Sequence, residues 1–248
     1  MINMRLAKKF AILGLLGMSC VVLTGCSAWK SRGLGTESRS KTLWEQKAPV
    51  VLDTKPDTRQ AQIDLALAAG SQLESRRDYP GAMKRYQEVL VLDKKHALAH
   101  HRMALLATRM SATQQAQEHF QIALSITPKD DALTADYAYW HYLYGNNDQS
   151  LELVNQGLAR SPGYQRFHGI RGLVLTRQQQ YESAVASFLE SGCNQQEAWA
   201  NVGHVLLLDG DVESAQYWIG HAAQGERGSE VARNTQRVIQ ASYISTQP

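Results

Sequence analysis

The feature that most constrains this chain is a pair of small residues, twelve positions apart, that recurs five times after residue 60. Successive copies are separated by 34, 34, 34 and 31 residues, and a bulky residue follows each pair by four positions. The pairs and their bulky residues are Gly70/Ala82 with Tyr86, Ala104/Ala116 with Phe120, Ala138/Ser150 with Val154, Gly172/Ala184 with Phe188, and Gly203/Ala215 with Ile219. A period of this length indicates structural units that stack on their neighbours.

The spacing within each copy predicts a helix-turn-helix unit. Two antiparallel helices approach closely only where the facing side chains are minimal, and the bulky residue then fills the gap to the next unit. Turn-forming residues stand where this arrangement needs them, at Asp78, Gly145-Asn146-Asn147 and Gly210-Asp211, while Pro128 and Pro162 end two of the units. With only 6 Pro and 4 Phe in 248 residues, the composition also favours helices. We therefore expect an all-α fold.

The period and the sequence Trp199-x2-Val202-Gly203-x2-Leu206 resemble the tetratricopeptide repeat (TPR) family. This resemblance implies a superhelical solenoid of about five helix-turn-helix repeats with a C-terminal capping helix. The chain departs from the family pattern at Ala66, where Trp is frequent, and at Lys94, where Pro is frequent. The fourth unit is also three residues short, around Gly192-Cys193-Asn194.

The first residues predict export and lipidation. Arg5, Lys8 and Lys9 precede an apolar stretch, residues 10–24, that is short for a membrane span. Leu23-Thr24-Gly25-Cys26 resembles the lipobox of bacterial lipoproteins, which implies cleavage before Cys26 and a diacylglycerol on its thiol; an uncleaved anchor is the alternative. Ser27 in the next position is compatible with transfer to the outer membrane, facing the periplasm.

The predicted organisation begins with a signal peptide and a linker that contains Gly, Ser and Pro without sustained apolar periodicity. The repeat domain follows, and a helix that Ser229 could cap covers its end. The ranges are 1–25 for the signal peptide, 26–59 for the lipidated N-terminus and flexible linker, 60–227 for the TPR domain with repeats at about 63–96, 97–130, 131–164, 165–195 and 196–227, and 228–248 for the capping helix and tail.

Charge and cysteine content exclude several classes of protein. Loss of residues 1–25 removes three basic residues and no acidic ones, so the formal net charge of +3 becomes zero. A neutral chain without a basic stripe does not predict nucleic-acid binding. Of the three cysteines, Cys20 leaves with the signal peptide and Cys26 is acylated. Cys193 therefore has no partner for a disulfide, and we interpret it as a small hydrophobic residue.

The TPR resemblance also implies a concave surface formed by the first helix of each unit. Its inward positions transfer to Leu67 and Ser71, and to the residues that we predict to form a partner-binding groove: His101, Leu105, Arg109, Tyr139, Tyr142, Leu173, Arg177 and His204. An apolar and aromatic surface with two arginines suits an extended peptide or a helix of another protein.

Two features qualify this groove. Tyr139 and Tyr142 either bind a partner or only stabilise the third repeat, as we expect of Tyr137 and Trp140. Some TPR proteins hold a C-terminal carboxylate with basic and amide side chains. Asp136 and Ile170 stand at positions where such groups are needed, so we do not expect that mode of binding.

Metal and catalytic sites have weak support. His96 and His100 are one helical turn apart, yet no nearby Cys or pair of carboxylates completes a metal site. Gly-x-Ser-x-Gly and His-Glu-x-x-His motifs are absent from the sequence. We therefore expect no metal, no catalytic residue and no cofactor other than the lipid on Cys26. An enzyme or metal protein that uses His101, His204 and Cys193 is one alternative, and a self-assembling repeat is another.

The function that these features predict is a membrane-anchored adaptor or scaffold in the cell envelope, with protein or peptide partners and no small-molecule substrate. The combination resembles the repeat lipoproteins that assist type IV and tight-adherence pili or secretins. A scaffold for peptidoglycan-processing enzymes is the alternative within the same class.

Overall fold

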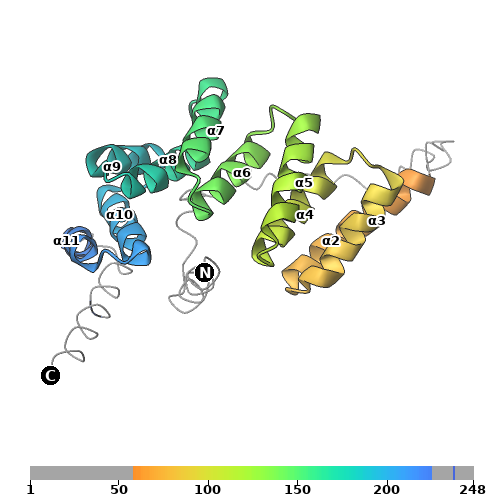
Figure 1. Cartoon of the computed structure of the whole chain (residues 1–248), viewed down its shortest axis with the longest axis horizontal. Helices are drawn as coiled ribbons and strands as arrows, with labels where there is room; N and C mark the ends of the chain where they lie inside the picture. The colour runs from red at the N-terminus through yellow and green to blue at the C-terminus, as the bar shows by residue number, and fades with distance from the viewer. Residues whose placement is uncertain (1–57, 225–236, 238–248) are drawn as a thin grey trace, which may run out of the picture. The chain divides into compact units, whose positions relative to one another are not determined.

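The computed structural model describes residues 58–224 and residue 237, and ten α-helices make up most of this part (Figure 1). The described residues contain no strand, and consecutive helices pair. The pairs are α2 (Thr58–Ser75) with α3 (Tyr79–Leu92), α4 (Ala97–Arg109) with α5 (Thr113–Ile126), α6 (Asp131–Leu143) with α7 (Asn147–Arg160), α8 (Gln165–Arg177) with α9 (Tyr181–Glu190), and α10 (Gln195–Asp209) with α11 (Val212–Ala223). The predicted all-α fold of about five helix-turn-helix units is confirmed.

Each helix pair packs through the small residues of the repeat. A Cβ atom added to Gly70 would lie 2.8 Å from the ring of Tyr86, and one added to Gly203 would lie 2.5 Å from Cγ1 of Ile219. Such distances are shorter than any real Cβ contact, so a larger residue would push the helices apart. The bulky residue of the second helix thus occupies the space that the small residue of the first helix leaves, as the spacing predicted.

The turns within the pairs share an unusual backbone conformation. The residue before each capping position has a positive φ, between 60° and 92°, and these residues are Arg77, Ser111, Gly145, Gln179 and Gly210. Three of the five are not glycine, although L-residues other than Gly, Asn and Asp rarely adopt this conformation. Asp78 and Asp211 follow such turns and accept hydrogen bonds from the first turn of the next helix.

The short fourth unit loses its residues from its second helix. α9 has 10 residues, whereas α3, α5 and α7 each have 14. The chain then turns at Gly192, with φ of 95°, and α10 begins at a capping box formed by Asn194 and Glu197. The contact residues Ala184 and Phe188 remain buried, so the deletion leaves the packing of this helix pair intact.

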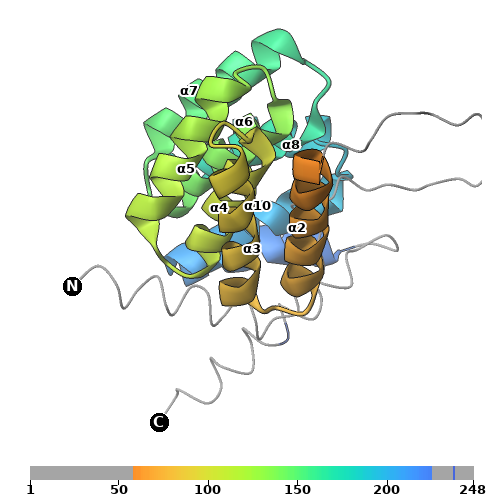
Figure 2. The same cartoon turned by 90° about the vertical axis from the view of Figure 1, so that its right-hand side faces the viewer.

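The described chain forms two compact units, one ending at Pro128 and the other beginning at Lys129. The first contains α2 to α5, and its core includes Ile63, Tyr86 and Met103. Figure 2 shows α2 and α3 of this unit side by side. The second contains α6 to α11 around a core in which Phe167, Phe188 and Ile219 are among the largest side chains. Each unit therefore has a hydrophobic core of its own.

Three predictions concern residues at the ends of the chain. The signal peptide, the lipidated Cys26 and the capping helix expected within 228–248 all lie outside the described residues, except that Arg237 is described. In the described part, no helix combines the length and the apolar character that crossing a bilayer requires.

Candidate partner-binding surfaces

The residues predicted to bind a partner lie on α4, α6, α8 and α10, which are the first helices of four helix pairs. Three of them, His101, Leu105 and Arg109, belong to the unit that ends at Pro128. The unit that begins at Lys129 holds Tyr139, Tyr142, Leu173, Arg177 and His204.

In the compact unit that ends at Pro128, three predicted residues form a stripe along α4. His101, Leu105 and Arg109 are spaced by four residues, which places their side chains on one face of the helix. His101 and Leu105 are partly exposed and Arg109 is exposed. This α4 stripe therefore offers a polar ring, an aliphatic side chain and a cation to a partner, in that order along the helix.

Glu74, which the sequence analysis did not single out, holds the arginine of the α4 stripe. Its Oε2 lies 3.5 Å from Nη1 of Arg109, and its Oε1 accepts a hydrogen bond of 2.6 Å from the hydroxyl of Tyr86. Burial and this hydrogen bond raise the pKa of the Tyr86 phenol, which therefore stays protonated and remains a donor. The Arg109 guanidinium also lies 5.7 Å from the centre of the Tyr79 ring, while half of its side chain surface stays accessible.

In the compact unit that begins at Lys129, Arg177 connects the first helices of three successive helix pairs. Its guanidinium lies 3.8 Å from the centre of the Tyr142 ring on α6, and its Nη1 donates to the carbonyl oxygen of Tyr142 at 2.5 Å. Its Nε and Nη2 donate to the two carboxylate oxygens of Asp209 on α10, at 2.9 and 3.3 Å. Asp209 was also missed by the sequence analysis. The bidentate ion pair neutralises Arg177, so its charge is largely satisfied within the protein.

The two arginines of the predicted groove both contact the preceding first helix, Arg109 through an ion pair and Arg177 through a backbone carbonyl and an aromatic ring. Each reaches back 35 residues, Arg109 to Glu74 and Arg177 to Tyr142, from one first helix to the first helix before it. A carboxylate or an aromatic residue 35 positions before an arginine, about one repeat length, is a sequence signal that could have predicted these contacts. In this register the arginine contributes to the packing between neighbouring repeats as well as to the surface.

Burial changes the interpretation of two predicted groove residues. Tyr142 is 4% exposed and Leu173 is 5% exposed, and both belong to the core of the second unit. Arg177 covers the Tyr142 ring, which the sequence alone suggested would face a partner. The expectation that these two side chains are exposed on the inner surface is therefore wrong, because both are packed in the core beneath it.

Tyr139 and His204 keep part of their surface exposed. Tyr139 stacks on Tyr142, with ring centres 5.8 Å apart and planes 26° apart, which fixes its orientation. Burial raises the pKa of the Tyr139 phenol and lowers the pKa of the His204 imidazole. Both shifts favour the neutral forms, so these residues supply uncharged aromatic surface with polar atoms.

The positions that a carboxylate-binding TPR groove would need do not offer free donors. Asp136 forms an ion pair with Arg166, and Ile170 is buried. A partner's C-terminal carboxylate would meet another carboxylate at the first position and no polar group at the second.

The histidines of the compact unit that ends at Pro128 form hydrogen bonds, although the spacing of His96 and His100 suggested metal ligands. His96 caps α4 by accepting a hydrogen bond from the amide of Ala99. His100 Nε2 lies 3.1 Å from the carbonyl oxygen of Lys94, and its Nδ1 lies 2.9 Å from Nδ1 of His119. Since a carbonyl only accepts, the proton of neutral His100 is on Nε2, and His119 donates to His100. Within residues 58–224, no three His, Cys, Asp or Glu side chains are grouped as metal ligands.

Cys193 is partly buried and packs against the core of the second unit. Its sulfur lies 3.5 Å from Oγ of Ser191 and 3.5 Å from Nδ2 of Asn201. These contacts fit a structural thiol that lies between the fourth and fifth units.

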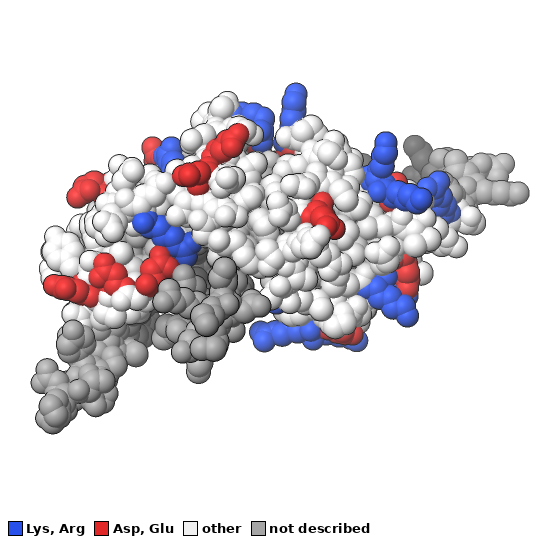
Figure 3. Space-filling model, in the orientation of Figure 1, with Lys and Arg blue, Asp and Glu red and all other residues white. Residues whose placement is uncertain are grey.

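Charged residues of both signs are interspersed over the face drawn in Figure 3, with uncharged surface between them. A field of mixed sign does not attract a polyanion such as a nucleic acid. Shape and short-range contacts are therefore the means of recognition that this face offers.

This packing of paired helices is the TPR fold, and comparison with solved structures agrees. No protein-family model and no curated protein matches the sequence. PilF of Pseudomonas aeruginosa is 18% identical, with a TM-score of 0.55 over 75% of this chain and 90% of that one. PilW, a widely conserved type IV pilus biogenesis factor, is 20% identical, with a TM-score of 0.55 over 77% and 96%.

A third structure that is similar to this chain is YrrB, a TPR protein with an unusual peptide-binding site. It is 14% identical, and the TM-score is 0.51 over 73% of this chain and 98% of that one. The structural neighbours thus include TPR proteins and pilus biogenesis factors. At these identities the likeness establishes the fold of this chain.

Proposed function

We propose that this protein is a lipid-anchored adaptor of the bacterial envelope that binds another protein through the inner faces of its repeats. The observation that carries the proposal is the α4 stripe on a TPR fold, in which Arg109 is exposed and His101 and Leu105 are partly exposed. TPR folds are typically protein-interaction modules without catalytic activity, and the proposal assigns no catalytic residue and no cofactor.

The chemistry of the exposed residues defines the partner. Leu105 and Tyr139 supply apolar and aromatic contact area, and Arg109 supplies a cation whose side chain is half exposed. A peptide segment or helix with an apolar anchor and a carboxylate about one helical turn away matches the α4 stripe. Tyr142, Leu173 and Arg177 hold the surface in shape instead of providing most of its contact area.

The proposed anchor is a diacylglycerol on Cys26, in the outer membrane and facing the periplasm. The lipobox-like sequence that ends at Cys26 supports it, and so does Ser27 after it. Metabolic labelling with an alkyne fatty acid tests it directly. The wild-type chain takes up the label and fractionates with membranes, and Cys26→Ser takes up none; label on the Cys26→Ser chain would contradict the proposal.

The pathway that we propose is assembly of a pilus, a secretin or a related secretion complex. The structural likeness to PilF and PilW supports this choice, and the likeness to YrrB, which has a peptide-binding site, supports peptide binding as the mode of contact. Deletion of the gene should reduce surface pili or secretin multimers in the native bacterium.

Complementation of that deletion separates the binding surface from the fold. The wild-type gene should restore assembly, whereas Leu105→Ala/Arg109→Ala/Tyr139→Ala should not, at equal protein level and helicity. A matched control, Gln121→Ala/Asn155→Ala/Glu182→Ala, changes three exposed residues of second helices and should restore assembly. Normal pili and secretins in the deletion strain would overturn the proposed pathway.

A further inference from the structure

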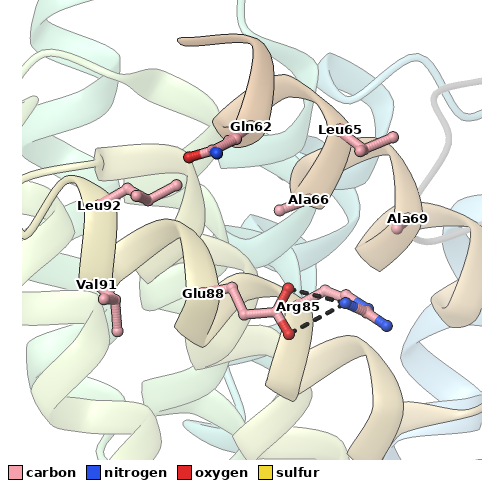
Figure 4. A pocket seen from close by; sticks show the side chains of 8 residues that line it. All are labelled: Gln62, Leu65, Ala66, Ala69, Arg85, Glu88, Val91 and Leu92. Atoms are coloured by element: carbon pink, nitrogen blue, oxygen red, sulfur yellow. Dashed lines mark hydrogen bonds and ion pairs between the residues drawn. The ribbon is translucent and has the colours of Figure 1, made fainter. Parts of the chain in front are cut away.

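The first helix pair has an apolar hollow that opens to solvent between α2 and α3. Its volume is about 410 Å³. Leu65 and Val91 at its edge are each 72% exposed, the largest exposed fractions of any large hydrophobic side chains in the described part. Its lining includes Leu65, Ala66, Val91, Leu92 and the ion-paired Arg85 and Glu88 (Figure 4).

Leu65 occupies a repeat position that is buried in every later unit. Its counterparts, at the same 34- and 31-residue offsets that relate the small residues, are Ala99, Leu133, Phe167 and Ala198. None of these four is more than 1% exposed. The position is therefore one that the repeat normally covers, and its exposure in the first helix pair marks the end of the described stack, where no described residue covers it.

The fourth unit shows what covers this position. The ring of Phe167 on α8 packs against Gly157 on α7, the second helix of the preceding unit, so closely that a Cβ on Gly157 would lie 2.2 Å from it. Leu65 has no preceding unit among the described residues. Val91 makes the exposed surface of the first helix pair more apolar, because the equivalent residues of the next two pairs are Ser125 and Ala159.

The chain itself enters at this hollow. Arg59, in the first turn of α2, donates a hydrogen bond to the carbonyl oxygen of Leu92, so the first turn of α2 lies beside the end of α3. Upstream stands Val50-Val51-Leu52, separated from α2 by Asp53-Thr54-Lys55-Pro56-Asp57, whose residue types favour a turn.

We propose that Val50-Val51-Leu52 folds back over the hollow and covers Leu65 and Val91. Six residues from Leu52 to Thr58 span up to about 20 Å. Leu65 is seven residues into α2, roughly 10 Å along the helix axis from Thr58. The connection is therefore long enough for the apolar segment to reach Leu65 after a reversal at residues 53–57.

The short connection also favours Val50-Val51-Leu52 over other molecules that could bind in the hollow. A segment tethered by about six residues has an effective concentration on the order of millimolar at its site. A second copy of the chain, or another envelope protein, competes from a much lower concentration. Burial of three aliphatic side chains against Leu65 and Val91 removes apolar surface from water on both sides, which favours the closed arrangement.

The consequence concerns the tether between anchor and repeats. The linker predicted from the sequence runs from residue 26 to 59, whereas the docked segment leaves only the residues before Val50 free. The repeats are then held closer to the point of attachment than the length of the linker suggests. The docking itself does not depend on whether Cys26 carries a lipid.

A photo-crosslinker in the full chain tests the docking. Benzoylphenylalanine replaces Leu65, whose exposure keeps the substitution compatible with the fold, and a matched chain carries it at the exposed Gln87 of α3. Equal amounts of ¹⁵N-labelled and unlabelled protein are mixed and irradiated. Fragment spectra then locate the link within the tryptic peptide Ala48–Arg59.

We expect the Leu65 probe to link to residues 50–52 of its own chain, without mixed-isotope products, at least five-fold more than the Gln87 probe does. Val50→Ser/Val51→Ser/Leu52→Ser should reduce this yield at least five-fold, with unchanged circular dichroism. Three results would overturn the proposal: links mainly between isotopically different copies, links mainly to another protein, or a yield no higher than that of the Gln87 control.

Discussion

The guanidinium of Arg177 lies 3.8 Å from the centre of the Tyr142 ring and at the same time forms a bidentate ion pair with Asp209. The three residues come from α8, α6 and α10, so one side chain connects three successive repeats of the second unit. An arginine whose sequence position suggested a contact with a partner is mainly an internal connection.

Loss of this connection should destabilise the protein. Arg177→Ala removes the cation over Tyr142 and leaves the Asp209 carboxylate without its partner, which should lower the free energy of unfolding by roughly 2–4 kcal/mol. Arg177→Lys should recover only part of this, because lysine lacks the planar fork. Urea unfolding followed by circular dichroism measures both. An Arg177→Ala chain as stable as the wild type would show that the contact contributes nothing.

Two glycines of α8 should respond in opposite directions to alanine. A Cβ on Gly172 would lie 2.8 Å from the Phe188 ring, whereas the nearest atom to a Cβ on Gly169 is 3.8 Å away. Gly172→Ala should therefore cost about 1–3 kcal/mol of stability through overpacking. Gly169→Ala should add about 0.5–1 kcal/mol because alanine favours the helix. Thermal unfolding of the two variants gives the comparison, and equal shifts would contradict it.

The same contact can be checked with a second substitution. Phe188→Leu removes ring atoms that crowd Gly172, so Gly172→Ala should cost less in that background than in the wild type. An unchanged cost would place the origin of the effect outside the Gly172–Phe188 contact.

The left-handed turn residues offer a gain in stability. Ser111 and Gln179 have φ of 61° and 60° at the turn position where Gly145 and Gly210 have φ of 81° and 92°. Ser111→Gly and Gln179→Gly should each raise stability by about 0.5–1 kcal/mol, because relief of the left-handed strain exceeds the entropy that glycine adds to the unfolded chain. Gly145→Ser is the reverse control and should lower the melting temperature; a fall in the melting temperature of either glycine variant would contradict the explanation.

Acid should weaken the fold through its histidines. Burial lowers the pKa of His119, with a contribution from nearby His100, and burial also lowers the pKa of His141 and His204. The unfolded chain then binds more protons than the folded chain once the pH falls below the ordinary histidine value. The stability contributed by these neutral histidines is present above about pH 6.5 and is lost as the pH falls through that value toward each folded pKa.

Melting temperatures between about pH 7.5 and pH 5 isolate this effect, because most carboxylates titrate lower. His119→Gln should flatten the slope, since glutamine can still donate to His100 and does not titrate. Gln121→Ala, at an exposed residue of α5 that does not titrate, is the control and should leave the slope unchanged. A slope that is the same in wild type and His119→Gln would contradict the assignment of His119.

The sequence predicted the fold because its determinants are local and repeated. Small residues such as Ala82 and Ala116, and bulky ones such as Tyr86 and Phe120, fix the helix pairs by spacing alone, and the structure buries all four. The positive φ of Arg77, Ser111 and Gln179 was not foreseen, because these residue types do not signal a left-handed turn. That conformation belongs to a turn that closes the first helix of each pair, in which the next residue donates back across the turn, as the amide of Asp78 does to the carbonyl oxygen of Leu73.

The binding surface was less predictable for a different reason. Exposure depends on contacts between side chains from separate repeats, such as Arg177 over Tyr142, and on contacts between paired helices, such as His100 with His119; repeat position alone does not reveal them. The sequence predicted an inner position for Tyr142, and the structure stacks its ring on Tyr139. It could not tell that another residue covers its ring.

Affinity capture from the native bacterium tests the central claim most directly. The tagged full chain is cross-linked to its neighbours in intact cells, and quantitative mass spectrometry compares three forms: wild type, Leu105→Ala/Arg109→Ala/Tyr139→Ala, and Gln121→Ala/Asn155→Ala/Glu182→Ala. Arg177 is left unchanged because its loss would disturb the fold.

We predict that the wild type and the second-helix control retain the same pilus, secretin or secretion protein, and that the Leu105/Arg109/Tyr139 variant loses it at least ten-fold. Equal retention by all three forms, or loss only in the second-helix control, would show that the partner binds elsewhere and would contradict the inner-face adaptor.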